Sequence, residues 1–181
     1  MDNNYISKFE YSLHKLITDF LLSKGAIDKI LPETPDIEEK WGKICMSYLP
    51  DGVREFSNYP TVSLGWMAFI GMAIANMWDE NWEIYSNNDN IYSSILLNRG
   101  YDHMDEYICQ DILMMDKQTE DSTSRLTGDL AESVYNALMH EHFEPATPEA
   151  FNAYVRCLHQ LYIFGAAIEL KRLGYHMTPL Q

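Results

Sequence analysis

The chain has 181 residues, enough for one domain that buries a large core without disulfides or metals. Its 27 acidic residues against 13 Lys and Arg leave a net charge of −14, and residues 55–98 and 126–155 contain no Lys or Arg. Nucleic acids and anionic membranes are bound through clustered cations, so the composition argues against both as partners. It favours a basic protein partner.

The compartment is inferred from the N-terminus and the cysteines. The opening MDNNYISKFE lacks the basic-then-apolar pattern of a secretory signal. Cys45, Cys109 and Cys157 lie far apart, each among apolar residues, with no Cys-x-x-Cys or Cys/His ligand spacing. We therefore expect buried, reduced thiols in a cytoplasmic protein.

Two helices are predicted before residue 60. Apolar residues at helical spacing predict the first from about Asn4 to Lys24, ended by Gly25. Thr34, Pro35 and Asp36 then form a start signal for the second. We expect the turn residues Pro50-Asp51-Gly52 to end that helix, with a short helical turn at 53–59.

The stretch LGWMAFIGMAIANMW, residues 64–78, carries no charge and predicts a central helix over about 63–84. It is shorter than the roughly 20 apolar residues of a membrane span and lacks basic flanks, which indicates a core helix. Small residues recur along one side, and we expect that side to contact the small residues 165–167. Asn76 is the one polar side chain, expected to form a structural hydrogen bond that fixes helix register.

Three more helical stretches complete the pattern. Residues 91–117 are helical with a break near Arg99-Gly100, after a loop at 86–90. The polar residues 118–123 are expected to form a mobile loop, followed by a helix over about 124–143 that Pro145 ends. Thr147, Pro148 and Glu149 start a last helix that stops at Gly174.

No segment alternates apolar and polar residues in the manner of a strand. The predicted fold is all-α: one helical-bundle domain over residues 1–181, with about five main helices and one or two short ones.

Two acid–histidine clusters are the candidate metal ligands, since imidazoles and carboxylates together suit Zn, Fe or Mn. They are Asp102, His103, Asp105 and Glu106 in the first cluster, and His140 and His142 in the second. The Glu-x-x-His motif of di-metal bundles is absent. The two histidines of the second cluster would also point about 200° apart on a helix. We therefore expect solvated acidic surfaces at these positions, with no metal and no cofactor.

Asp105 is the second candidate structural polar residue, because it lies beside the apolar face of its predicted helix. If it is buried, its carboxylate must be paired, hydrated or protonated. Arg99 and His103 are the expected partners, and an orientation toward water is the alternative.

Catalytic motifs are absent: the sequence contains no G-x-S-x-G, no G-x-x-x-x-G-K-[ST] and no G-x-G-x-x-G. We prefer the interpretation of a non-enzymatic protein-interaction module, which binds a basic partner or self-associates through an aromatic patch near Trp82 or Tyr92. The alternative is a bundle that binds a small molecule or a metal, including an enzyme that uses the Asp, Glu and His clusters. That alternative requires the two clusters to lie within a few ångströms of each other.

Overall fold

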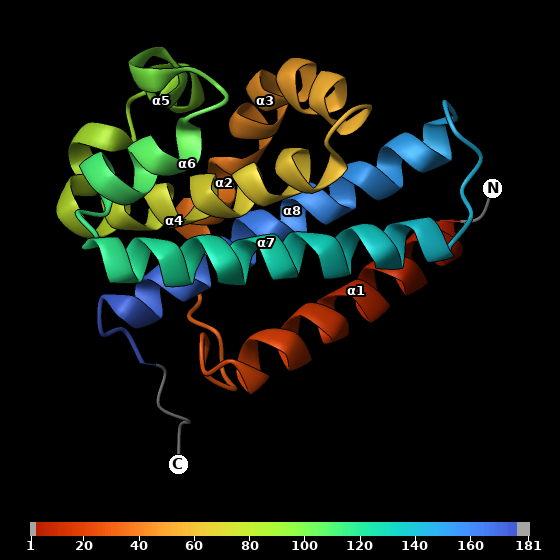
Figure 1. Ribbon diagram of the computed structural model, residues 1–181, viewed down its shortest axis with the longest axis horizontal. Coiled ribbons are helices and arrows are strands. Elements are labelled where there is room, and N and C mark those ends of the chain that lie inside the picture. Colours follow the sequence, from red (N-terminus) through yellow and green to blue (C-terminus); the bar gives the residue numbers. More distant parts are fainter. Residues whose placement is uncertain (1–2, 177–181) are drawn as a thin grey trace.

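The computed structural model describes residues 3–176, in which helices joined by loops are the regular structure and no strand occurs, so the all-α prediction is confirmed (Figure 1). In chain order the elements are α1 (Asn3–Ser23), α2 (Pro35–Glu39), α3 (Trp41–Phe56), α4 (Pro60–Tyr85), α5 (Ile91–Arg99), α6 (Met104–Tyr107), the π-helix η1 (Ile108–Ile112), α7 (Lys117–His140) and α8 (Pro148–Arg172).

Five of these helices have 16 residues or more: α1, α3, α4, α7 and α8. They match five of the six helical stretches predicted from the sequence, and the sixth, residues 91–117, forms only the short helices α5, α6 and η1. The short pieces are more numerous than predicted, because the segments at 35–56 and 91–117 are each divided. The break at Gly100 is confirmed, since α5 ends at Arg99 and Gly100 has a φ of 74°.

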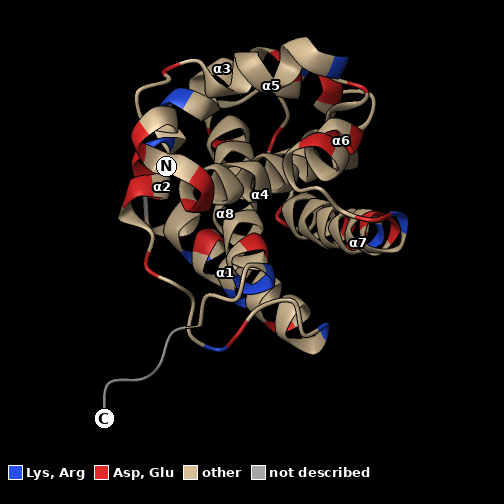
Figure 2. Ribbon diagram, turned by 90° about the vertical axis from the view of Figure 1, so that its left-hand side faces the viewer, with Lys and Arg blue, Asp and Glu red and all other residues tan. Residues whose placement is uncertain are grey.

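Helix α4 lies in the centre of the molecule and packs most extensively against α8, then against α7 and α3. Its side chains from Ser63 to Ala75 are buried with the exception of Trp66, which is partly buried. Figure 2 shows the middle of α4 free of charged residues, whereas acidic residues are spread over the surrounding elements. In the described part of the chain, α4 alone is long and apolar enough to span a membrane, and 72% of its most apolar window is buried in the protein. That burial is typical of a core helix.

The small residues of α4 and α8 form a seam in which the two backbones touch. A Cβ atom on Gly165 would collide with the carbonyl of Ala68 and lie 3.0 Å from its Cα atom. A Cβ on Gly71 would likewise collide with the carbonyl of Tyr162, 3.0 Å from the amide nitrogen of Ala166. The predicted contact between the small side of the central helix and residues 165–167 is therefore confirmed. Only glycine fits at these two positions.

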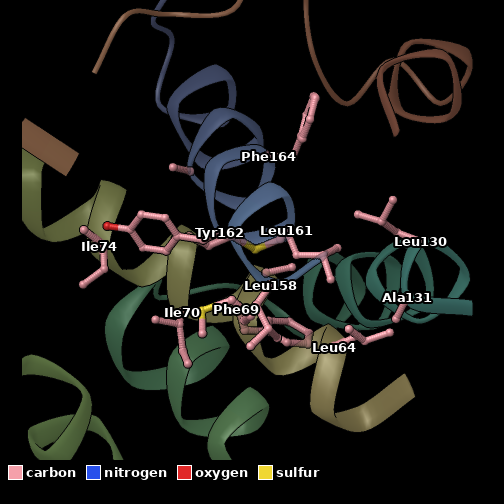
Figure 3. Close-up of a cluster of buried hydrophobic side chains, with 14 of the residues drawn as sticks. Leu64, Phe69, Ile70, Ile74, Leu130, Ala131, Leu158, Leu161, Tyr162 and Phe164 are labelled. Carbon is pink, nitrogen blue, oxygen red and sulfur yellow. The ribbon is translucent and has the colours of Figure 1, made fainter. Parts of the chain in front are cut away.

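Larger side chains fill the core on either side of the seam (Figure 3). They come from three helices, and burying each Leu, Ile or Phe side chain among them contributes about 1.5–3 kcal/mol. The labelled members are Leu64, Phe69, Ile70 and Ile74 of α4, Leu130 and Ala131 of α7, and Leu158, Leu161, Tyr162 and Phe164 of α8. Cys45, Cys109 and Cys157 are buried free thiols, as the sequence predicts.

Helix α8 has the ends that its sequence predicts. The Thr147 hydroxyl accepts a hydrogen bond from the amide of Ala150 at 3.2 Å, which caps the first turn. At the other end Gly174 has a φ of 94°, and the amide of Tyr175 donates to the carbonyl of Leu170 at 2.9 Å. Residues 177–181 of the predicted C-terminal tail lie outside the described part.

The predicted turn at Pro50-Asp51-Gly52 is wrong, because α3 continues through it to Phe56. A proline inside a helix costs about 3 kcal/mol through its missing N–H and its ring. Tertiary contacts hold this segment helical. Tyr48 is fully buried one turn before Gly52, and a Cβ at Gly52 would lie within 3 Å of the Tyr48 ring and the Tyr154 hydroxyl. The division of this region occurs instead at Lys40, between α2 and α3.

The predicted mobile loop at 118–123 is also wrong, since these residues form the first turns of α7. Asp116 caps the helix by accepting a hydrogen bond from the amide of Thr119 at 2.7 Å. Lys117 and Asp121 form an ion pair of 3.0 Å one turn apart. Glu120 is buried against the π-helix. Capping and pairing make these residues helical in spite of their polar composition.

The predicted aromatic patch is wrong for Tyr92, which is 2% exposed. Its ring packs edge-on against Tyr48, and its hydroxyl donates to Asp51 at 2.6 Å. Trp82 is partly buried and packs against the core. The two residues do not form an exposed surface for self-association.

Candidate functional site

The two acid–histidine clusters lie at opposite ends of α7. Gln110, on η1 next to the first cluster, donates to Glu120 near the start of α7 at 3.0 Å. His140 ends the same helix twenty residues later, which is about 30 Å along the axis. Figure 1 shows α6 and the connector between α7 and α8 at the two ends of the molecule. The convergence that a shared metal site would require is therefore not observed.

The first cluster is a set of surface groups around α6. Arg99 pairs with Asp111 at 2.9 Å and with Glu106 at 4.0 Å, and the His103 ring lies 3.7 Å from Glu106. Asp102 is exposed and Asp105 half-buried. Burial raises the pKa of Asp105, and the negative charges of Glu106 and Glu120 act in the same direction. Neither Arg99 nor His103 pairs with Asp105, so both expected partners are wrong.

The second cluster lies where α7 ends. His140 is the last helical residue and His142 has a φ of 54°, which turns the chain and brings the two rings to 6.2 Å between centroids. Across residues 3–176, no three His, Cys, Asp or Glu side chains are close enough together to hold a metal ion.

The most buried charge in the described structure is one that sequence reasoning missed. Glu169 of α8 is 0% exposed and accepts hydrogen bonds from Nε and Nη2 of Arg172, both at 2.7 Å. Arg172 Nη2 also donates to the carbonyl of Leu113 at 3.2 Å. The hydrogen bonds to Glu169 raise the pKa of the Arg172 guanidinium. A signal existed in the sequence, since Glu169 interrupts an apolar run from Leu161 to Leu170.

Asn76 of α4 contacts the ion pair of Glu169 and Arg172. Its side-chain amide lies 3.5 Å from the Glu169 carboxylate, so the one polar side chain of residues 64–78 faces the most buried acid of the described residues. The hydrogen-bond partner of Asn76 is thus Glu169, and the role of Asn76 in fixing helix register stays a prediction. The bond joins α4 to α8 beyond the glycine seam.

The π-helix η1 packs beside this buried pair. π-helical turns are rare and frequent at functional sites. Cys109 of η1 is fully buried, and burial together with the charges of Glu120 and Asp105 raises the pKa of its thiol to about 12. Such a thiol is not a nucleophile at neutral pH. After η1 the chain turns through Met114, which has a φ of 53° and a 76% exposed side chain.

A polar hollow of about 780 Å³ opens above the pair, between the ends of α4 and α8, the helix α5 and η1. Its walls combine amides, carboxylates and branched apolar side chains. They include Asn76, Asp79, Glu80, Ile91, Ser94, Ile95, Asp111, Ile112, Leu113 and Arg172.

An apolar groove of about 900 Å³ lies at the other end of the molecule, between α3, the end of α7 and the start of α8. Three of its apolar side chains are exposed: Val53 and Met139 at 43%, and Phe151 at 46%. The remaining principal members are Phe56, Leu138 and Phe143. Sequence reasoning did not find the groove, because its residues come from segments about 90 positions apart.

Buried tyrosines and Ser63 form a hydrogen-bonded cluster between α3, α4 and α8. The Tyr48 hydroxyl donates to the carbonyl of Ser63 at 2.6 Å and lies 2.9 Å from that of Tyr101. Ser63 Oγ donates to the carbonyl of Gly52 at 2.7 Å and lies 2.6 Å from the Tyr154 hydroxyl. Burial raises the pKa of Tyr48, Tyr101 and Tyr154. Every hydroxyl has a partner, so the cluster is structural.

Searches with the sequence against models of protein families and against curated proteins, and with the structure against solved structures, found no significant match.

Proposed function

We propose that this protein is a protein-interaction module whose apolar groove binds an amphipathic helical segment rich in Lys and Arg. The observation that carries the proposal is the coincidence of three exposed apolar side chains with a surrounding stretch, residues 126–155, that contains acids but no Lys or Arg. Single exposed apolar residues are ordinary, whereas three that converge on one groove are typical of an interaction site.

The charge around the groove selects the partner. From Leu126 to Val155 the chain has no Lys or Arg but five acids, namely Asp129, Glu132, Glu141, Glu144 and Glu149. This stretch forms the second half of α7, the connector and the start of α8, which provide most of the groove residues. On α3, the cation nearest the groove in sequence is Arg54, which pairs with Asp51 at 2.9 Å. Apolar anchors flanked by cations complement such a surface, as in known helix-in-groove complexes.

The groove is held in shape before any partner binds. The Phe143 ring packs edge-on against Tyr5 and Phe9 of α1, at 5.7 Å in both cases. The Tyr5 hydroxyl donates to Glu141 at 2.6 Å, and the Thr147 hydroxyl donates to the carbonyl of Glu144 at 2.6 Å. His142 and Ala146 have left-handed φ values of 54° and 62°, a strain of roughly 1 kcal/mol or more each. A connector fixed in this way reduces the entropy lost on binding.

The test is titration of the full chain with a labelled peptide of about 18 residues that places Leu on one helical face and Lys on the other. We expect saturable binding that weakens at least tenfold when NaCl rises from about 50 to about 300 mM. A peptide with Glu in place of Lys should not bind, and one with the same residues scrambled should bind poorly.

Two variants locate the binding. Phe151→Glu places a charge in the groove and should weaken binding at least tenfold. Leu97→Glu alters an apolar side chain of α5 that is 85% exposed and outside the groove, and should change affinity less than twofold. Equal binding of the Lys and Glu peptides would refute the charge argument. Equal effects of the two variants would refute the groove, and concentration-dependent dimers abolished by Phe151→Glu would make a second copy the occupant.

A further inference from the structure

We propose that the polar hollow between α4, α5, η1 and the end of α8 is a second site, and that it binds a small zwitterion of the amino-acid class with an aliphatic side chain. The hollow is separate from the apolar groove. Phe151 and Arg172 lie near opposite ends of α8, about 30 Å apart along the helix.

The floor of the hollow presents an oriented guanidinium edge. Arg172 uses Nε and Nη2 for Glu169 and uses Nη2 again for the carbonyl of Leu113. Its Nη1 donates no hydrogen bond to any residue of the described part, and its side chain is 35% exposed and lines the hollow. An Arg fixed by a carboxylate behind it has lost its rotamer freedom in advance and can receive a ligand carboxylate at that edge.

The opposite charge lies at the mouth of the hollow, at the end of α4. Asp79 accepts a hydrogen bond from Tyr175 at 2.5 Å, and Glu80 accepts one from Tyr85 at 3.4 Å. Neither carboxylate pairs with a cation of the described residues, whereas Asp111 across the hollow is paired with Arg99. Because Glu169 neutralises Arg172, a purely anionic ligand would be repelled by the mouth. A ligand that also carries an ammonium group can place it near the Asp79 and Glu80 carboxylates, which removes this repulsion.

Apolar side chains form part of the walls, beside the polar side chains of Asn88, Ser94 and Asn98. Ile91 and Ile95 of α5 face the hollow, as do Ile112 and Leu113 from the π-helix segment. A carboxylate at Arg172 and an ammonium toward α4 leave a branched aliphatic side chain to contact these residues. Mixed apolar walls with a few convergent polar groups are the usual composition of small-molecule sites.

Three related probes separate the contributions: leucine, isocaproate (leucine without its amine) and isoamylamine (leucine without its carboxylate). Isothermal titration of the full chain should give binding of leucine at least tenfold tighter than of either fragment. Isoamylamine binding as tightly as leucine would show that the carboxylates act alone. Isocaproate binding as tightly would show that Arg172 acts alone. Either result would overturn the proposal, as would the absence of leucine binding.

Arg172→Lys keeps a cation for Glu169 but removes the Nη1 edge, and should weaken leucine at least tenfold while leaving isoamylamine unchanged. A pair of exposed serines on α5 gives a test independent of the buried ion pair. Ser94 lines the hollow and Ser93 does not. Ser94→Trp should abolish leucine binding and Ser93→Trp should not, with both variants folded by circular dichroism. Unchanged leucine binding in Ser94→Trp would refute the site.

Discussion

Two parts of the same helix pair hold α4 and α8 together in different ways. At the glycine seam, around Gly71 and Gly165, the contact is backbone against backbone, with no room for a side chain. Near the end of α8 the contact depends on Asn76, Glu169 and Arg172, a polar network beside a hollow. Almost any substitution in the close-packed seam is destabilising, whereas a buried charged residue can be replaced if its partner is replaced as well. The seam is therefore the structural part of the interface, and the polar end is the part available for function.

The largest expected effect is at the seam. Gly165→Ala should lower the free energy of unfolding by about 3 kcal/mol, because the new methyl group collides with the Ala68 carbonyl and forces the helices apart. Alanine's better helix propensity offsets about 1 kcal/mol of the collision energy. Urea denaturation followed by circular dichroism measures the change. A variant as stable as the parent would show that the backbones do not touch.

Removing one partner of the polar network should cost less, because Arg172 is partly exposed. Arg172→Met leaves the Glu169 carboxylate buried without its cation, and should lower the free energy of unfolding by about 2 kcal/mol. The double variant with Glu169→Leu should recover much of that loss, since an apolar pair needs no charge compensation. A double variant no more stable than Arg172→Met would show that the unpaired Glu169 carboxylate is not what destabilises the single variant.

Gly128→Ala is the matched control for the seam and should have the opposite sign. Gly128 is an exposed residue inside α7, and nothing lies within 4 Å of the position of a Cβ. Alanine there should raise the free energy of unfolding by about 1 kcal/mol. The same denaturation experiment measures it. Destabilisation instead would show that glycine is required for a reason other than space.

The smallest effect is expected at Asp105, beside the polar end. Its folded-state pKa is raised above the ordinary 3.8, so the folded protein favours the protonated acid. The stability contributed by that proton is complete below about pH 3.8 and is lost as pH rises through the folded pKa. Asp105→Asn should therefore match the parent at low pH and exceed it by about 0.5 kcal/mol at pH 7. Thermal melts at several pH values test the sign, and a larger gain at low pH would contradict it.

The sequence by itself determined the class of fold, the central helix and the seam. These follow from local signals, namely helical periodicity, a charge-free run, capping residues at Thr147 and Gly174, and small residues at matching spacing on 64–78 and 165–167. Periodicity identifies the buried side of a helix before its neighbours are known. It did not reveal that α3 continues through Pro50 or that residues 118–123 are helical, because packing of Gly52 and burial of Glu120 decide those segments.

Only the tertiary structure decided where polar groups meet. The two acid–histidine clusters, which the sequence indicates as candidate metal ligands, lie at opposite ends of α7. By contrast, Asn76 and Glu169 are 93 positions apart in the sequence and are in contact. The groove likewise joins Val53 to Phe151, and the hollow joins Asp79 to Arg172. Periodicity gives the face of each helix but not which faces are opposed or where helix ends leave space. Those depend on how the helices cross, which long-range packing sets.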